Sequence, residues 1–194
     1  MHLPPVILAS ASPRRSDLLR EMNVEFQVVP SDAEEIHNEQ LTAREICQVN
    51  AYRKARAIAK RYPDMLVIGA DTLVYLGVRL FGKPRDLPEA EKMLAGLSGK
   101  IHQVVTGVCL IHLRAHRQQV FADTTDVTFR ALSAEQIRNY LEKIEPLDKA
   151  GAYAIQDHGD LIVDHVDGSL SNVIGLPVER LRVELDRFRI ADSH

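Results

Sequence analysis

The chain has 194 residues, of which 45% are hydrophobic and 26% are charged, so it is long enough for one folded domain with a substantial core. A formal net charge of −3 gives no reason to expect a nucleic-acid-binding surface, and no apolar segment is long enough to span a bilayer. Cys47 and Cys109 lack metal-ligand spacing, and no signal-peptide pattern opens the chain, so we expect reduced core cysteines in a cytoplasmic protein.

The first predicted elements are a short strand, a helix that follows it directly, and a second strand. Residues 6–9 are apolar and rich in β-branched side chains, as in a buried strand. Ser12 followed by Pro13 is typical of a helix N-terminus. Residues 24–29 alternate and predict the next strand.

Two arginines stand in the first turn of this helix. Free backbone N–H groups at a strand-to-helix turn attract anions, whereas Arg14 and Arg15 oppose the helix dipole there. A bound phosphate explains both features, because a guanidinium group binds phosphate bidentately. The alternative is that one arginine pairs with Asp17 or Glu21 and the other is solvated.

An acidic loop and a basic helix come next. The acidic run at residues 31–35 is typical of a solvated loop, and the alternative is a loop that folds over the phosphate site and holds a cation. The capping box of Thr42 and Glu45 predicts a helix that ends near Arg61. Most of its basic side chains are expected to face solvent, and spacing does not say whether one points into a cleft. These side chains are Arg53, Lys54, Arg56, Lys60 and Arg61.

A carboxylate interrupts the next apolar strand. Residues 65–70 are apolar, Asp71 and Thr72 follow, and residues 73–76 are apolar again. A buried carboxylate is costly unless it is paired or bound to a metal, so its presence here favours a functional role. An Asx turn at a strand end is the alternative.

The segment after it carries a lysine on a rigid backbone. A short strand around residues 79–81 precedes Lys83, and Pro84 holds that lysine in an extended conformation. Asp86 then caps a helix that runs through Leu97. Lys83 is interpreted either as a surface lysine or as a phosphate ligand.

The second half of the chain is rich in antiparallel patterns. Residues 102–113 and 118–129 alternate and predict a hairpin, and a capping box at Ser133 begins a helix. Residues 161–163, with a turn at residues 167–168, suggest another hairpin.

A final amphipathic helix after Pro177 completes the pattern. It carries Leu181, Val183, Leu185 and Phe188. The alternation of helices with long antiparallel segments predicts an α/β fold with a mixed sheet and one domain over residues 1–194.

Several motifs are absent, which narrows the chemistry. The chain has no Walker A, Gly-x-Gly-x-x-Gly, Gly-x-Ser-x-Gly or His-Glu-x-x-His motif, and we interpret His165 with its neighbouring aspartates as solvated turn residues. What remains is a set of anion binders and a set of carboxylates. Such a combination points to metal-assisted hydrolysis of a phosphoanhydride. The anion binders are Ser10, Arg14, Arg15, Lys54 and Lys83, and the carboxylates are Asp71 and the acidic loop.

Five segments, in order along nearly the whole chain, resemble the Maf family of nucleoside triphosphate pyrophosphatases, described as house-cleaning enzymes and linked to septum formation. The resemblance implies an elongated, twisted mixed β-sheet flanked by helices around a central nucleotide cleft, related to the inosine triphosphatase fold. The segments are Ala9-Ser10-Ala11-Ser12-Pro13-Arg14-Arg15, Gly69-Ala70-Asp71-Thr72, Gly82-Lys83-Pro84, Leu97-Ser98-Gly99-Lys100 and Gly151-Ala152-Tyr153-Ala154-Ile155-Gln156.

The resemblance also implies residue roles. Asp71 resembles the family's proton acceptor, and Glu35 is similar to a carboxylate that holds a divalent metal, Mg²⁺ or Mn²⁺, together with Asp71. Water attack on the α–β phosphoanhydride would give a nucleoside monophosphate and pyrophosphate. The positions that match triphosphate contacts are Ser10, Arg14, Arg15, Lys54 and Lys83.

At two positions this chain resembles the branch of the family that acts on dTTP and UTP. Thr72 and Gln156 match this branch, and a hydroxyl and an amide are suited to reading a pyrimidine edge. Gly82 stands where some members carry Glu, and Asp157 stands where a glycine is common. The alternatives are a pyrophosphatase for a modified purine such as 7-methyl-GTP, and a non-catalytic nucleotide-binding regulator of cell division. Family analogy also suggests a homodimer, with no nucleic-acid or membrane partner.

Overall fold

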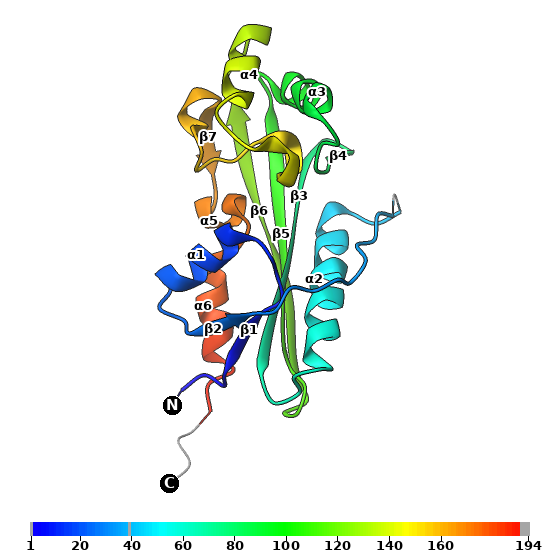
Figure 1. Cartoon of the computed structure of the whole chain (residues 1–194), viewed down its shortest axis with the longest axis vertical. Coiled ribbons are helices and arrows are strands. Elements are labelled where there is room, and N and C mark those ends of the chain that lie inside the picture. The colour runs from blue at the N-terminus through cyan, green and yellow to red at the C-terminus, as the bar shows by residue number, and fades with distance from the viewer. Residues whose placement is uncertain (1, 39, 191–194) are drawn as a thin grey trace. The chain divides into compact units, whose positions relative to one another are not determined.

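The computed structural model describes residues 2–38 and 40–190, and their strands form one mixed sheet (Figure 1). The strands are β1 (Val6–Leu8), β2 (Phe26–Val28), β3 (Leu66–Leu76), β4 (Arg79–Phe81), β5 (Ile101–His112), β6 (Arg117–Phe129) and β7 (Val163–Asp167). Their order is β2-β1-β3-β5-β6-β7, with β4 paired to β3. β1 runs parallel to β2 and β3, whereas β4 is antiparallel to β3 and β7 is antiparallel to β6. The predicted mixed α/β sheet is therefore confirmed.

Four of the helices begin where the capping residues Ser12, Thr42, Asp86 and Ser133 predict. The helices are α1 (Pro13–Glu21), α2 (Ala43–Ala59), α3 (Leu87–Leu97), α4 (Ala134–Leu141), α5 (Leu170–Ile174) and α6 (Val178–Asp186). The capping boxes at Thr42 and Ser133 are both formed, and Asp86 caps α3 by accepting a hydrogen bond from the backbone N–H of Glu89 at 2.8 Å. Ser12 is the N-cap residue of α1, but its hydroxyl makes no capping hydrogen bond.

The predicted hairpin near residues 161–163 is wrong. Residues 159–161 form a 3₁₀ turn, and β7 pairs with β6 in antiparallel register, with Val166 opposite Val127. The turn at residues 167–168 leads into helix α5 instead of a second strand. A Gly in a tight turn predicts a change of direction but does not specify whether a helix or a strand comes next.

The contacts of the chain divide into two compact units. The first contains the chain up to Asp71, Thr106–Asp123 and the chain from Gly175 onward, and the second contains Thr72–Val105 and Thr124–Ile174. Strands β3, β5 and β6 contribute residues to both units.

Each unit has its own hydrophobic core. In the first unit, α2 packs on β1, β3 and β5, and Cys109 is one of the buried side chains. In the second unit, the buried aromatic side chains of Phe81, Phe129 and Tyr140 pack with residues of α3 and α4. Cys47 is likewise buried and free, as expected for a core thiol.

Candidate active site

Asp71 lies in the middle of β3, not at the end of a strand. Its strand continues from Leu66 to Leu76, and the Asp71 side chain is 7% exposed. The alternative interpretation as an Asx turn is therefore wrong. A carboxylate so deeply placed in an apolar strand requires polar partners, because its desolvation is costly.

Two glycines allow helix α2 to lie directly on the sheet beside Asp71. A Cβ atom at Gly69 would collide with the backbone of Ala51 and the Cβ of Ala55. A Cβ atom at Gly107 would collide with the backbone of Cys47. Figure 1 shows the resulting course of α2 along β3 and β5. This close approach brings the polar side chains on that face of α2 within reach of the strand.

Two residues one helical turn apart on α2 reach Asp71. Lys54 donates to Oδ1 of Asp71 at 2.8 Å, and Asn50 donates from Nδ2 to Oδ2 of Asp71 at 3.0 Å. The i, i+4 spacing places Asn50 and Lys54 on one face of the helix. Both carboxylate oxygens of Asp71 are thus bonded, which offsets the cost of burying them.

The acidic loop folds over this same group. Lys54 also donates to Oε1 of Glu35 at 2.6 Å, so its ammonium group bridges two carboxylates. The Lys54 side chain is 13% exposed, whereas that of Glu35 is 42% exposed. The structure therefore joins the predicted residues Glu35, Lys54 and Asp71, and it identifies Lys54 as a basic side chain of α2 that points inward.

Sequence reasoning missed Asn50. This side chain is 1% exposed, and its amide bonds both Asp71 and the backbone of Ile36 in the acidic loop. A neutral amide in a helical pattern gives little signal by itself. The i, i+4 spacing to Lys54 is the feature that would have singled it out, once Lys54 was known to point inward.

The predicted anion site is built around Arg15. The η1 nitrogen of Arg15 donates to Oγ of Ser10 at 3.1 Å, and its Nε donates to the carbonyl oxygen of Gly175 at 2.9 Å. The backbone N–H of Ser12 also donates to Oγ of Ser10, at 3.2 Å. Arg15 is therefore held in a fixed orientation at the strand-to-helix turn, together with Ser10.

The electrostatic surroundings of Arg15 include the site carboxylates. Burial lowers the pKa of the Arg15 guanidinium, and the nearby charge of Asp71 opposes that change. Arg14 lowers the Arg15 pKa further, and Glu35 raises it. Asp17, the residue considered as an alternative partner, pairs with Arg20 at 2.6 Å on the exposed side of α1. The cationic and carboxylate groups of the first unit thus interact electrostatically.

The other predicted site residues belong to the second unit. Thr72 follows Asp71 directly on β3 and is half-buried, whereas Lys83 and Gln156 are exposed. The backbone N–H of Gly151 donates to the carbonyl oxygen of Gly82 at 3.0 Å. Two of the motifs that resemble the Maf family, one containing Lys83 and one containing Gln156, are thereby joined.

Gly151 is required at this junction. Its φ of 71° lies in the left-handed region, and a Cβ atom there would lie 3.2 Å from two methyl carbons of Val74. Ala152, which follows, also has a positive φ of 62°. The segment therefore has an uncommon backbone conformation held against β3.

The two departures from the family pattern cause no steric conflict. At Gly82 a Cβ atom would meet nothing within 4 Å, so glycine is not enforced there. Asp157 is not among the described residues with positive φ, whereas His158, the next residue, has a φ of 56°. The left-handed residue of this segment is therefore His158.

The donor set can be compared with what a divalent cation prefers. Among the described residues, no group of three or more His, Cys, Asp and Glu side chains is placed to hold an ion. Two carboxylates, those of Asp71 and Glu35, are nevertheless joined through Lys54. Mg²⁺ commonly takes one or two protein carboxylates and completes its shell with waters and substrate phosphates, so this pair fits such an ion.

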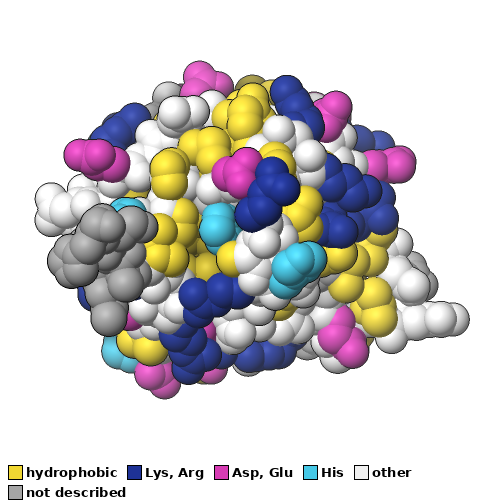
Figure 2. Space-filling model, turned by 90° about the horizontal axis from the view of Figure 1, so that it is seen from below, with side chains coloured by type: hydrophobic (Ala, Val, Ile, Leu, Met, Phe, Trp, Pro, Cys, Tyr) yellow, Lys and Arg dark blue, Asp and Glu magenta, His cyan; other side chains and the backbone are white. Residues whose placement is uncertain are grey.

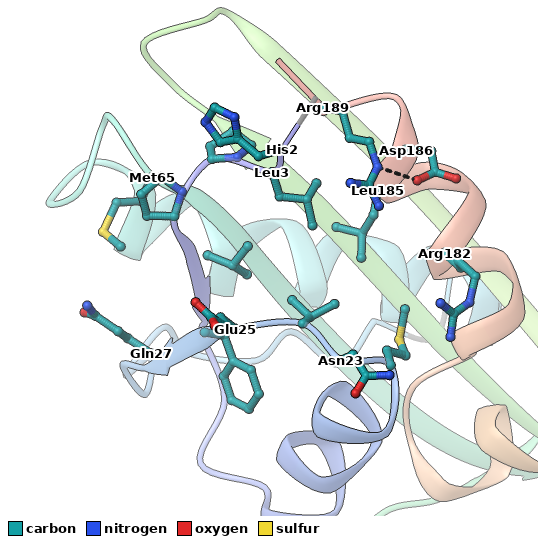
Figure 3. A pocket seen from close by; sticks show the side chains of 16 residues that line it. His2, Leu3, Asn23, Glu25, Gln27, Met65, Arg182, Leu185, Asp186 and Arg189 are labelled. Atoms are coloured by element: carbon teal, nitrogen blue, oxygen red, sulfur yellow. Dashed lines mark hydrogen bonds and ion pairs between the residues drawn. The ribbon is translucent and has the colours of Figure 1, made fainter. Parts of the chain in front are cut away.

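A separate cavity of about 760 Å³ lies elsewhere in the first unit (Figure 3). It is lined by the N-terminal segment, the start of β2 and the end of α6, where Arg189 pairs with Asp186 at 2.8 Å. None of the predicted site residues lines it. The cavity is therefore distinct from the Asp71 group.

The surface seen in Figure 2 carries mixed charges. Lys and Arg side chains lie among acidic, histidine and hydrophobic side chains on this face. Across the described part of the chain, no helix is both long and apolar enough to cross a membrane.

The mixed α/β sheet thus holds a buried carboxylate and cationic side chains around one strand of its first unit. The family model described as Maf-like protein matches residues 5–188, and the chain belongs to this family.

Named relatives match over most of the chain, and a solved structure shares its fold. A dTTP/UTP pyrophosphatase of Akkermansia muciniphila is 46% identical over 176 residues, covering 91% of this chain and 92% of that protein. A dTTP/UTP pyrophosphatase of Alkaliphilus oremlandii is 48% identical over 181 residues, covering 93% and 94%. The structure of the Staphylococcus aureus Ham1 protein matches with a TM-score of 0.55 at 18% identity, covering 95% of this chain and 100% of that one. This likeness shows the fold alone, and that fold is the mixed sheet flanked by helices that the sequence predicts.

Proposed function

We propose that this protein is a nucleoside triphosphate pyrophosphatase that hydrolyses dTTP and UTP to the nucleoside monophosphate and pyrophosphate. The observation that carries the proposal is the buried Asp71 carboxylate, which is bonded at 2.8 Å by Lys54 and at 3.0 Å by Asn50. The names of relatives that match over nine-tenths of the chain support the substrate.

In the proposed reaction Asp71 acts as the proton acceptor. Water attacks the α-phosphorus, its oxygen forms the new P–O bond, and its proton passes to the Asp71 carboxylate. The bond between the α-phosphorus and the bridging oxygen breaks, and the electron pair leaves with pyrophosphate. An intact carboxylate at this position is what separates a hydrolase from a protein that only binds the nucleotide.

The cationic side chains would bind the triphosphate. Ser10 and Arg15 are already hydrogen-bonded to one another at the N-terminus of α1, where backbone N–H groups favour an anion. Lys54 bridges two carboxylates, so its ammonium group lies beside Asp71, where it would also meet a phosphate oxygen. Arg14 and Lys83 complete the proposed set of triphosphate ligands.

We propose a divalent cation, Mg²⁺ or Mn²⁺, as the cofactor. Asp71 and Glu35 would hold it, and when bound it would neutralise phosphate charge and lower the pKa of a bound water. Thr72 and Gln156 are proposed to read the pyrimidine base, because a hydroxyl and an amide leave unpaired polar groups when the wrong base enters.

A substrate panel tests this function. Purified protein with Mg²⁺ is given each canonical nucleoside triphosphate and 7-methyl-GTP, and pyrophosphate release is measured. We expect dTTP and UTP to be the preferred substrates, and Asp71→Asn to reduce turnover by about 10²–10⁴-fold, the usual contribution of a general base. A preference for 7-methyl-GTP would contradict the pyrimidine assignment. Nucleotide binding without turnover would indicate a regulator instead of an enzyme.

A further inference from the structure

We propose that Asn50 is a positioning residue that holds the Asp71 carboxylate and the acidic loop in one geometry. This inference rests on the proposed function, because it assigns Asn50 a role in the same reaction. Asn50 lies on α2, its side chain is 1% exposed, and it contacts both the strand and the loop through hydrogen bonds.

The orientation of the Asn50 amide is fixed by the backbone of Ile36. The Ile36 N–H can only donate, and it donates to Oδ1 of Asn50 at 2.8 Å. The amide nitrogen must therefore occupy the other position, from which it donates to the carbonyl oxygen of Ile36 at 3.2 Å and to Oδ2 of Asp71 at 3.0 Å. A flipped amide would lose the first bond and place an oxygen against the Asp71 carboxylate.

This arrangement distinguishes the two oxygens of Asp71. Oδ2 accepts from a neutral, buried amide that has no freedom to turn, whereas Oδ1 accepts from the flexible ammonium group of Lys54. The amide bond to Oδ2 therefore fixes the orientation of the carboxylate independently of the position of the Lys54 side chain.

Asn50 also connects two parts of the site that are distant in sequence. Ile36 directly follows Glu35, so the backbone bonds of Asn50 hold Glu35 at a set distance from Asp71. Lys54 spans the same two carboxylates with its charge, but Asn50 fixes the backbone from which one of them extends. Misplacement of reacting groups by a fraction of an ångström is enough to slow an enzyme.

Asn50→Ala tests the proposal. We expect kcat for UTP, with Mg²⁺ present, to fall about 10- to 100-fold, the range for loss of a hydrogen bond to a charged group. The Kd of a non-hydrolysable α,β-imido analogue of UTP should change by less than about threefold, because the triphosphate ligands are untouched. Urea unfolding measures the folded fraction, by which kcat is corrected.

Arg53→Ala is the matched control on the same helix. Arg53 donates from Nε to the carbonyl oxygen of Glu34 at 2.9 Å, so it also ties the acidic loop to α2. It belongs to the exposed surface, and no hydrogen bond joins it to Asp71 among the described contacts. We expect its kcat to stay within about threefold of that of the unchanged protein. An equal loss in Arg53→Ala and Asn50→Ala would reduce the role of Asn50 to holding the loop and would overturn the proposal.

A second variant keeps the test decisive when Asn50→Ala does not fold. Asn50→Asp preserves the size of the side chain and an acceptor for the Ile36 N–H, but it presents a carboxylate oxygen where a donor faced Asp71. Its kcat should fall at least as far as that of Asn50→Ala.

The outcomes separate this inference from the proposed function. Unchanged turnover in either Asn50 variant would overturn the positioning role. A rise in the Kd of the UTP analogue large enough to explain the whole loss of turnover would overturn it as well. A protein that releases no pyrophosphate from any triphosphate, even without substitution, would overturn the proposed function itself.

Discussion

Each unit buries a titratable side chain, Asp71 in the first and His102 in the second, and the two are accommodated differently. In the first unit, the buried Asp71 carboxylate keeps two hydrogen-bond donors, one of them the charged Lys54. In the second, His102 is 1% exposed and lies among the rings of Phe129 and Tyr153, with ring centroids 4.7 and 5.5 Å away. The Asp71 carboxylate is compensated by hydrogen-bond partners, whereas burial keeps His102 neutral.

The buried titratable groups His102 and Tyr140 of the second unit have shifted pKa values. Burial lowers the pKa of His102 to about 4 and raises that of Tyr140 to about 12, so neither group is charged near neutral pH. The Tyr140 hydroxyl donates to the carbonyl oxygen of Ala154 and accepts from its N–H, both at 3.1 Å. These groups stabilise the loop that precedes Gln156, whereas Asp71 in the first unit is the residue proposed to take part in the reaction.

Removing Lys54 should have the largest effect on stability. Lys54→Met leaves the buried Asp71 carboxylate without its cationic partner, and breaking such a pair costs about 3–5 kcal/mol. Urea unfolding at pH 7 measures the loss. The double variant Lys54→Met with Asp71→Asn should recover much of it, because no buried charge remains. Equal stability of the single and double variants would show that Asp71 is compensated by other groups.

Acid should weaken the second unit through His102. The pKa of His102 in the folded chain, about 4, lies below its ordinary value of 6.5. Between pH 6.5 and pH 4 the ring is therefore protonated in the unfolded chain but neutral in the folded chain. The free energy of unfolding therefore keeps its full value above pH 6.5. It decreases by up to about 3 kcal/mol as the pH falls toward 4. Unfolding in urea from pH 7 to pH 4 measures this slope. His102→Gln removes the titrating ring and should make the free energy of unfolding less dependent on pH. An unchanged pH dependence in that variant would assign the acid sensitivity to other groups.

The smallest effects are expected where the backbone of the second unit is left-handed. Gly151→Ala places a methyl group near Val74 at a φ of 71° and should cost about 1–2 kcal/mol. Ala152→Gly relieves a φ of 62° and should be neutral or stabilising by less than about 1 kcal/mol. Thermal unfolding of the two variants compares them directly. Effects of the same sign and size would show that φ is not what selects glycine there.

Local rules account for the element order and for much of the site. The Thr42 capping box and Asp86 mark helix starts because they act through neighbours three residues away, and both caps are formed. Ser12-Pro13 also marks the start of α1, although Ser12 makes no side-chain cap. Asp71 was recognisable because a carboxylate in an apolar run is costly wherever the strand lies. The turn at residues 167–168 was predicted, but the helix after it was not, because a turn sequence reverses the chain without specifying the next element.

The sequence by itself thus determined the mixed α/β fold, the family and the residues that can carry charge chemistry. Only the tertiary structure decided which side chains of α2 reach Asp71, since Gly69 and Gly107 set how closely that helix approaches the sheet. That approach selects Lys54 from five basic residues and adds Asn50, which no local pattern distinguishes. Periodicity fixes which residues share a helix face, whereas packing against a strand fixes which of them meet a given atom.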